Sequence, residues 1–242
     1  MEFQNEIGLI QRKMAASVAG SSRRLEILDV LDIQSGQQVL DIGCGGGHLL
    51  EELAKAVGPK GKAIGLDTSE DQLKQAKKKC ALYNNTSTLL GFANKINLER
   101  NSCDAVASAQ TFEYIEDVDE SIEEVARILK PSSIFVNISI LWDYYKFYGA
   151  EDNLNNLIQD TFKAHCFHQM LPTTLSGRLK KFGFKQLKHK PLPVFITTTD
   201  DNSPAKYAAE VMAQFAIQKG VSIDKVKPVS YTHLTLPTKR IV

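Results

Sequence analysis

Apolar and polar positions alternate along the chain in a strand–helix rhythm between residues 38 and 140. Short apolar runs, which favour buried strands, are separated by longer stretches whose apolar residues recur at helical spacing. The rhythm predicts an α/β fold with a doubly wound, mostly parallel sheet and helices on both faces. The predicted strands cover residues 38–42, 63–66, 88–92, 105–108 and 134–140, and the predicted helices cover 47–58, 69–82 and 118–129.

Helical periodicity also flanks this central part. Residues 6–31 are predicted to be helical, with Ser21 or Ser22 as an N-cap. After Trp142 the rhythm changes, and the pattern predicts helices at 151–165, 171–182 and 204–219 and a strand at 184–189. We therefore expect an N-terminal helical segment (1–34) followed by a main domain (35–228).

Composition excludes several classes of function. The formal net charge is +1, so no excess of charge attracts a phosphate backbone or an anionic membrane. No stretch reaches the roughly 18 apolar residues of a membrane span, and no secretory signal precedes the domain. The four cysteines form no CxxC pair and are predicted to be reduced thiols of a cytoplasmic protein.

The candidate chemistry lies in residues 39–48, which read VLDIGCGGGH. Glycines at 43, 45 and 47 follow a predicted strand and open a helix, so that the backbone can turn tightly and approach a flat ligand. Asp67 ends the next strand, 20 residues after Gly47, where a carboxylate can accept from both ribose hydroxyls of a nucleoside. A dinucleotide-binding dehydrogenase shares these features.

Asp41 and His48 distinguish between the possible nucleoside ligands. The dinucleotide pattern GxGxxG needs glycine where this chain has His48. Asp41 stands two residues before the first glycine, and a pyrophosphate beside it would be repelled by several kcal/mol at an effective dielectric of about 20. A ligand with an ammonium group would instead gain a charge-assisted hydrogen bond. S-adenosylmethionine (SAM) carries such a group and no phosphate, so Asp41 favours SAM.

Three stretches of the chain resemble motifs of the class I SAM-dependent methyltransferases. Residues 39–48 resemble the first motif, and residues 65–69 (GLDTS) resemble the second. Residues 104–131, with DAVAS, FEYIED and EVARILKP, resemble the fourth strand and the helix after it. The resemblance covers about residues 35–140 and is nearest to the small-molecule branch that includes quinone-biosynthesis C-methyltransferases. It implies a Rossmann-like fold, SAM as the cofactor and a small-molecule methyl acceptor.

The resemblance also implies roles for single residues. Asp41 and the loop glycines would hold the methionine part of SAM, Asp67 the ribose, and Thr68 would lie beside the adenine. Family members usually have an acid where this chain has Phe92, so the adenine contact would pass to backbone groups or Asn94. The predicted cofactor-binding residues are Asp41, Gly43, Cys44, Gly45, Gly47, Asp67, Thr68, Ala93, Asn94, Ala109 and Gln110.

Glu113 and Tyr114 are the predicted catalytic residues, at the mouth of the fourth strand. Either would orient an acceptor or remove its proton while the acceptor attacks the methyl group in line, although a solvated loop pair fits the sequence as well. Residues 141–228 are expected to build the acceptor pocket. No metal is predicted, because His165 and His168 lack a third ligand.

Two other functions stay open from the sequence. One is a SAM-binding protein that no longer catalyses, which the departure at Phe92 allows. The other is an NAD-dependent oxidoreductase, which Asp41 and His48 disfavour.

The last residues, 229–242, resemble a translated sequencing adapter and are left out of the fold prediction. Class I methyltransferase domains end with an antiparallel seventh strand between the fifth and the sixth. We expect this strand to be missing through truncation near Lys227, which leaves six genuine strands, or to be replaced by residues 232–236.

Overall fold

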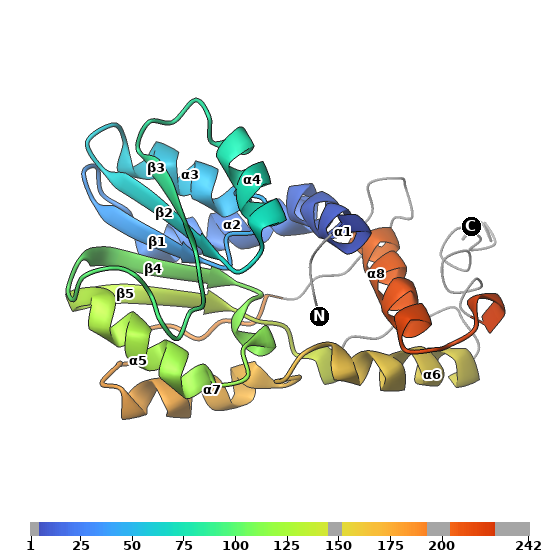
Figure 1. Cartoon of the computed structure of the whole chain (residues 1–242). Helices are drawn as coiled ribbons and strands as arrows, with labels where there is room; N and C mark the ends of the chain where they lie inside the picture. Colours follow the sequence, from blue (N-terminus) through green and yellow to red (C-terminus); the bar gives the residue numbers. More distant parts are fainter. Residues whose placement is uncertain (1–4, 145–151, 193–203, 226–242) are drawn as a thin grey trace, which may run out of the picture.

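The computed structural model describes residues 5–144, 152–192 and 204–225, and its centre is one parallel sheet (Figure 1). The strands lie in the order β3-β2-β1-β4-β5, and every neighbouring pair is parallel. The change of direction after β1 places the carboxyl ends of β1, β2 and β4 side by side. The strands are β1 (Gln38–Ile42), β2 (Lys62–Asp67), β3 (Thr86–Leu90), β4 (Cys103–Ala109) and β5 (Leu129–Ile138).

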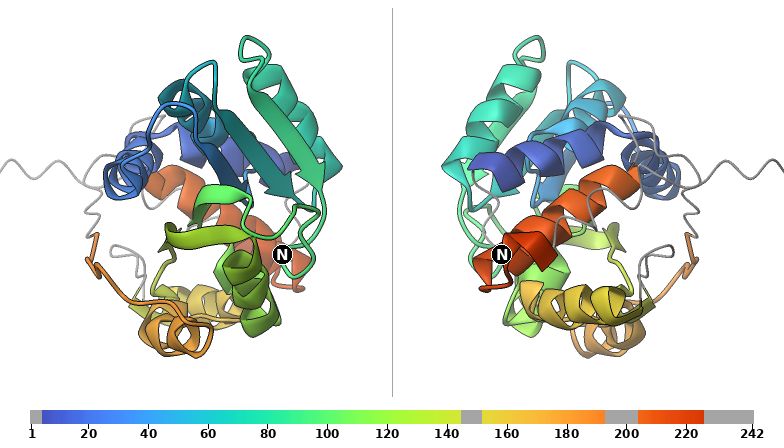
Figure 2. Two further views of the ribbon diagram at one scale, coloured as in Figure 1. Left: turned by 90° about the vertical axis from the view of Figure 1, so that its left-hand side faces the viewer. Right: turned by 90° about the vertical axis from the view of Figure 1, so that its right-hand side faces the viewer.

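Helices cover both faces of the sheet, as Figure 1 and the left-hand view of Figure 2 show. One face packs on α2 (Val18–Leu31), α3 (His48–Val57) and α4 (Glu70–Lys79) around a core that includes Leu50 and Leu53. The opposite face packs on α5 (Val118–Ile128) and α7 (Leu171–Lys181) around a core that includes Phe112 and Ile122. The predicted doubly wound α/β fold is therefore confirmed.

A third group of helices lies beyond the carboxyl edge of the sheet. It consists of α1 (Asn5–Ala16), α6 (Asp152–Phe162) and α8 (Pro204–Gln218), which we call the cap helices. The right-hand view of Figure 2 looks onto this edge and shows α8 in front of the strands and α6 below it, beside α7. Phe162 of α6 and Phe215 of α8 belong to a separate small core that joins these two helices. Three short 3-10 helices complete the description: η1 (Phe112–Tyr114), η2 (Trp142–Tyr144) and η3 (Lys163–His165).

Two helix starts follow directly from side chains in the sequence. The Ser69 hydroxyl accepts from the Gln72 N–H and caps α4, as the sequence pattern predicted. The Asp117 carboxylate accepts from the Glu120 N–H and caps α5. The end of α5 at Ile128 also agrees with the predicted stop before Pro131, although β5 starts earlier than the predicted strand, at Leu129.

Residues 6–31 are helical as predicted, but the N-cap inside this stretch is Ser17 and not Ser21 or Ser22. The chain leaves helical geometry at Ser17, whose extended backbone (φ −70°, ψ 168°) and side chain form the N-cap of α2. Ser17 therefore has the capping role predicted for Ser21 or Ser22. Gly20 suits the resulting corner, because a Cβ there would lie 2.2 Å from the Ala15 carbonyl oxygen.

The prediction of a strand at 184–189 was also wrong. Residues 184–192 have no regular secondary structure, and within the described part of the chain no strand pairs with the outer edge of β5. A strand requires backbone partners, and this segment is instead attached through side chains. Lys188 contacts Asp29 of α2 at 3.7 Å, and Lys190 contacts Glu26 at 2.8 Å. The candidate replacement strand at 232–236 lies outside the described residues.

Among the helices described, none combines the length and the apolar character that crossing a bilayer requires.

Gly47 sets how closely α3 approaches α4, and this gives a stability prediction. Gly47 has φ +82°, and a Cβ on it would lie 2.8 Å from Cα of Ala76, whereas Gly36 has φ +90° with nothing within 4 Å. We expect Gly36→Ala to lower the free energy of unfolding by about 1–2 kcal/mol through backbone strain. Gly47→Ala should cost about 1–3 kcal/mol more through overpacking. Urea denaturation measures both, and equal losses would contradict the role of the Ala76 contact.

Candidate functional site

Most backbone N–H groups of the glycine loop between β1 and α3 already donate to acceptors within the protein. The N–H groups of Gly43 and Cys44 both donate to the Leu66 carbonyl, at 2.7 and 3.0 Å. The Gly45 N–H donates to Asp67 Oδ2 at 2.9 Å, and the Gly47 N–H donates to the Cys44 carbonyl. A loop that binds phosphate directs such N–H groups at its ligand. This loop directs four of them at itself and at the end of β2, so it suits a ligand without phosphate.

Asp41 lies at the centre of the site, in β1, with only 2% of its surface exposed. Burial, followed by repulsion from Asp67, raises the pKa of Asp41 from 3.8 to about 8, while Arg24 and the Leu50 N–H act in the opposite direction. Its Oδ2 is buried without a hydrogen-bond partner. A buried carboxylate with one unpartnered oxygen is an acceptor for a positively charged donor.

Asp67 ends β2 beside the loop and is held by backbone donors. Its two carboxylate oxygens accept from Gly45 and Ser69, both at 2.9 Å, and burial raises its pKa. Each oxygen keeps a second lone pair for a ligand. Thr68, the next residue, is exposed and lines the same cavity.

The segment after β3 lines the cavity near Asp67. Ala93 is buried, whereas the Phe92 side chain is 68% exposed. Asn94 donates from Nδ2 to Glu120 Oε2 at 2.9 Å, so this amide is turned toward α5. This bond uses the donor of the Asn94 amide, and its Oδ1 is the atom that could accept from an adenine amine, so both alternatives for the adenine contact stay open.

The end of β4 closes the site on its other side. Ala109 and Gln110 line the cavity, and the Gln110 N–H donates to the Ile138 carbonyl at 2.6 Å. Gln110 has φ +55°, a strained value for a residue other than glycine, and such strain concentrates at functional sites. Thr111 packs on the loop so closely that a Cβ on Gly43 would lie 2.0 Å from its Oγ1.

A cavity of about 2460 Å³ joins these residues at the carboxyl edge and extends along the outer side of β5, where Leu129 and Phe184 also line it. The total is larger than the roughly 300–1,000 Å³ typical of a site for one small molecule, because it includes the space beside β5 as well as the site itself. Ten of the eleven predicted cofactor residues line it; the exception is Gly47, which packs on α4. Tyr114 lines the cavity as well, and Glu113 does not.

Glu113 is completely buried and holds the chain after β5. Its carboxylate accepts from Ser139 Oγ at 2.7 Å and from the Ile140 N–H at 3.4 Å. Burial raises the pKa of Glu113 from 4.5 to about 7. This placement fits a positioning residue better than a group that touches the acceptor.

Tyr114 belongs to an aromatic cluster at the junction of the sheet and the cap helices. Its ring lies 5.6 Å from that of His165, which stacks on Phe162 at 3.8 Å and meets Trp142 at 4.4 Å. Burial raises the pKa of Tyr114 well above its usual value. The phenol is therefore neutral near pH 7, which favours orienting an acceptor over removing its proton.

His165 and His168 are not brought together as metal ligands. Nδ1 of His165 lies 2.6 Å from the Phe162 carbonyl oxygen, and Nε2 of His168 lies 3.1 Å from the Glu116 carbonyl oxygen. No group of three metal-binding side chains occurs among residues that the structure describes.

Sequence reasoning missed the contribution of α1, which lies over the glycine loop. A Cβ on Gly45 would lie 3.2 Å from Nε2 of Gln11, and one on Gly46 would lie 2.9 Å from Cδ of Arg12. Arg12 also forms an ion pair with Asp71 of α4 at 3.1 Å. No motif marks these residues, because their positions depend on how α1 packs rather than on local sequence.

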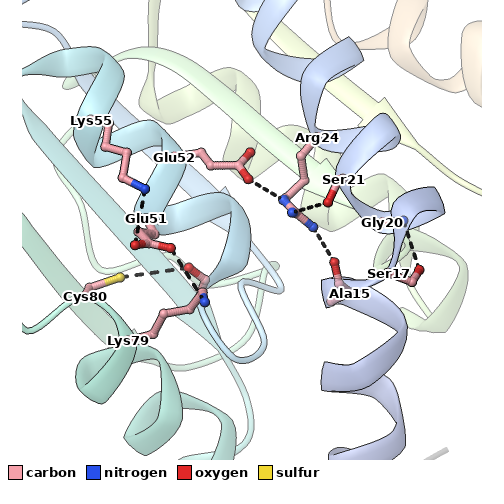
Figure 3. A network of polar contacts seen from close by, with 11 residues as sticks. Ala15, Ser17, Gly20, Ser21, Arg24, Glu51, Glu52, Lys55, Lys79 and Cys80 are labelled. Atoms are coloured by element: carbon pink, nitrogen blue, oxygen red, sulfur yellow. Dashed lines mark hydrogen bonds and ion pairs between the residues drawn. The ribbon is translucent and has the colours of Figure 1, made fainter. Parts of the chain in front are cut away.

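Arg24 connects the N-terminal helices to α3 (Figure 3). Its guanidinium donates to Glu52 of α3 at 2.8 Å, to the Ser21 hydroxyl at 3.1 Å and to the Ala15 carbonyl at the end of α1. Figure 3 also shows Glu51 on the next position of α3, paired with Lys55 and with Lys79 of α4. One arginine thus connects α1, α2 and α3 around the site.

The sheet order, the glycine loop and the two acids define a Rossmann-like nucleoside-binding domain of the methyltransferase class. The chain belongs to the methyltransferase domain family, whose profile matches residues 33–199. The resemblance found in the sequence is thereby confirmed.

Individual relatives agree with this assignment. The demethylmenaquinone methyltransferase of Staphylococcus aureus is 33% identical over 113 residues, which is 47% of this chain and 47% of that protein. The chain therefore spans about half the length of this curated relative. A SAM-dependent methyltransferase of Aquifex aeolicus shares the fold (TM-score 0.54, 24% identity, 67% of this chain and 79% of that one). So does a [4+2]-cyclase (TM-score 0.54, 17% identity, 88% and 74%).

The buried Asp41 carboxylate predicts an unusual dependence of stability on pH. Its folded pKa of about 8 exceeds the ordinary 3.8, so between these values the folded state retains a proton that the unfolded chain releases. The Asp41 contribution to stability is therefore lost as pH rises through this window. We expect Asp41→Asn to raise the free energy of unfolding near pH 8 by about 1–3 kcal/mol. The gain should shrink toward pH 4. Urea denaturation of the ligand-free protein across this range tests it, and a gain that grows at low pH would contradict it.

Glu113 gives a second prediction. Glu113→Ala leaves the Ser139 hydroxyl and the Ile140 N–H without their acceptor, which should cost about 1–3 kcal/mol of unfolding free energy. The exposed neighbour Glu116 serves as the control, because Glu116→Ala should stay within about 0.5 kcal/mol of wild type. Chemical denaturation measures both. A loss no larger than that of the control would show that Glu113 does not hold this segment.

Proposed function

We propose that the protein binds SAM at the glycine loop and transfers its methyl group to a small-molecule acceptor. The observation that carries the proposal is the buried Asp41 carboxylate, which has one unpartnered oxygen beside a loop whose N–H groups are mostly engaged. A ligand with an ammonium group and no phosphate satisfies both conditions. An NAD cofactor, with two phosphates, satisfies neither.

The residues present fit this cofactor. Asp41 would accept from the α-amino group, with Gly43, Cys44 and Gly45 beneath the methionine part. Asp67 would accept from the ribose hydroxyls, with Thr68, Ala93 and Asn94 around the adenine, and Ala109 and Gln110 would bound the methionine end. Gly47 would act indirectly, by letting α3 start close to α4.

The chain's own part in the reaction is positioning. When bound, SAM supplies a methyl group activated by a positive sulfur. Tyr114, neutral and at the end of β4, would orient the acceptor, and Glu113 would hold the segment after β5 that borders the same cavity. Placing the two reactants in line is sufficient to accelerate such a displacement.

The relatives support a small-molecule acceptor. The Staphylococcus aureus relative is a demethylmenaquinone methyltransferase, whose named acceptor is a quinone and not a protein or a nucleic acid. The balanced composition, with a formal net charge of +1, agrees with an acceptor other than nucleic acid.

A SAM-binding protein without methyl transfer is the second candidate. Two observations favour it: the exposed Phe92 at the adenine side, and the [4+2]-cyclase that shares this fold. Turnover distinguishes the candidates, because both bind SAM and only the enzyme consumes it in the presence of an acceptor.

Calorimetric titration with S-adenosylhomocysteine tests the cofactor, with NADH as the comparison ligand. We expect micromolar binding of S-adenosylhomocysteine, at least about tenfold weaker in Asp41→Asn because a charge-assisted hydrogen bond is lost. The matched control Glu70→Gln, which removes an exposed carboxylate at the start of α4, should leave the affinity unchanged. Tight binding of NADH alone would overturn the proposal.

A further inference from the structure

The part of the cavity beneath the cap helices differs in chemistry from the cofactor part. Its wall, which we call the cap compartment, combines residues of α1, η2, α6 and α8. These residues are Met14, Trp142, Phe162, Ala208, Val211 and Met212. Phe162, Ala208 and Met212 are buried and fix the wall, while the others are half-buried and face available space.

Charge is excluded from this wall. Among the described residues, every cavity-lining residue that the cap helices and η2 contribute is uncharged, and Gln11 is the one with a side-chain amide. Two lysines of the cap helices are directed at aromatic rings: Lys13 lies 5.9 Å from the Tyr207 ring and Lys219 lies 5.4 Å from the Phe215 ring. The cation Arg23 of α2 lines another part of the cavity and acts on the buried Glu113. The cofactor part of the same cavity, by contrast, contains Asp41 and Asp67.

The aromatic rings that adjoin the compartment are neutral as well. Burial lowers the pKa of His165 to about 4, so its stack with Phe162 and its edge contact with Trp142 involve no cation near pH 7. A charged ligand group placed here would lose its hydration without gaining a partner of opposite charge.

The compartment is continuous with the glycine loop. Gln11 of α1 approaches Gly45, and Met14 lies one helical turn further along the same face of α1. Tyr114, which follows β4, contacts the aromatic cluster through His165. Met14, at one border of the compartment, is therefore about one helical turn, roughly 5 Å, from the residue of α1 that adjoins the loop.

We infer that the cap compartment binds the body of an uncharged, largely apolar methyl acceptor, such as an aromatic ring or a short hydrocarbon chain. This inference rests on the proposed function and names the substrate class of the same site. Shape and apolar contact hold the acceptor body, and Tyr114 is left to orient the reacting atom. Acceptors with a carboxylate, a phosphate or an ammonium group in the body are rejected by desolvation.

The single tryptophan of the chain makes the inference directly measurable. Trp142 lies in the compartment wall, so quenching of its fluorescence reports occupancy. The probes are naphthalenemethanol, naphthoate and naphthylmethylammonium, which share a ring system and differ in charge. With the protein saturated with S-adenosylhomocysteine, we expect the neutral alcohol to bind at least about tenfold more tightly than either ion. An ion that binds as tightly as the alcohol would overturn the inference.

Substitutions in the wall of the cap compartment test whether the probes bind there. Val211→Lys and Met14→Lys place a cation on two different helices of the wall, and each should weaken binding of the alcohol at least about tenfold. Val211→Lys should also raise the affinity for naphthoate relative to the alcohol, a change that partial unfolding does not produce. The matched control Gln218→Lys adds the same charge at an exposed position of α8 and should change affinity less than about twofold. Unchanged binding of the alcohol in both wall variants would overturn the inference.

Cofactor binding is measured separately, so that the two proposals fail independently. S-adenosylhomocysteine should bind to Val211→Lys as it does to wild type, since Val211 does not adjoin the glycine loop. If wild type binds S-adenosylhomocysteine but prefers charged probes, the substrate class is wrong and the proposed function stands. If it binds no S-adenosylhomocysteine, the proposed function fails, and with it the identification of the compartment with a methyl acceptor.

Discussion

The burial of the Asp41 carboxylate is the constraint on which the site depends. Parallel pairing sets Asp41 of β1 opposite Gly65 of β2 and Ala107 of β4, so it lies in the middle of the sheet with little access to water. The pairing of β1 with β2 also brings Asp67 near enough to raise the pKa of Asp41 further. The Leu50 N–H at the start of α3 only partly offsets this cost. The ligand-free fold therefore keeps Asp41 protonated below about pH 8, and a cationic ligand would favour its charged form.

The N-terminal helices complete this arrangement from outside the sheet. Arg24 is itself almost fully buried, and it contacts Glu52, Ser21 and the last turn of α1 at once. The end of α1 is held by Arg24, and Gln11 further up the helix accepts from Nε2 of Gln72 in α4 at 3.0 Å, so both contacts place α1 over the glycine loop. The same helix borders both the cofactor part of the cavity and the cap compartment, so occupancy of either part is linked to one rigid element.

Local sequence predicted the sheet well and its surroundings less well. The five strands have strong local signals in their apolar runs, and the N-cap of α4 at Ser69 has one in its capping box. The loop glycines and both acids were also predictable, since they are adjacent to those strands. The break between α1 and α2 at Ser17 was not predictable, because a serine inside a helical pattern acts as an N-cap only if the chain turns there. The predicted strand at 184–189 was wrong for a related reason. A strand forms only beside a partner strand, and the residues of the segment do not specify that partner.

The side chains at the mouth of β4 show how adjacent residues acquire different roles. Glu113 and Tyr114 are consecutive in one 3-10 helix, so they point in different directions. Glu113 points inward to Ser139, and Tyr114 points toward the cavity and His165. An uncharged compartment makes this division consistent. A buried carboxylate facing an apolar acceptor would be left without partners, whereas a neutral phenol can donate one hydrogen bond to the reacting atom and keep its ring against the aromatic wall.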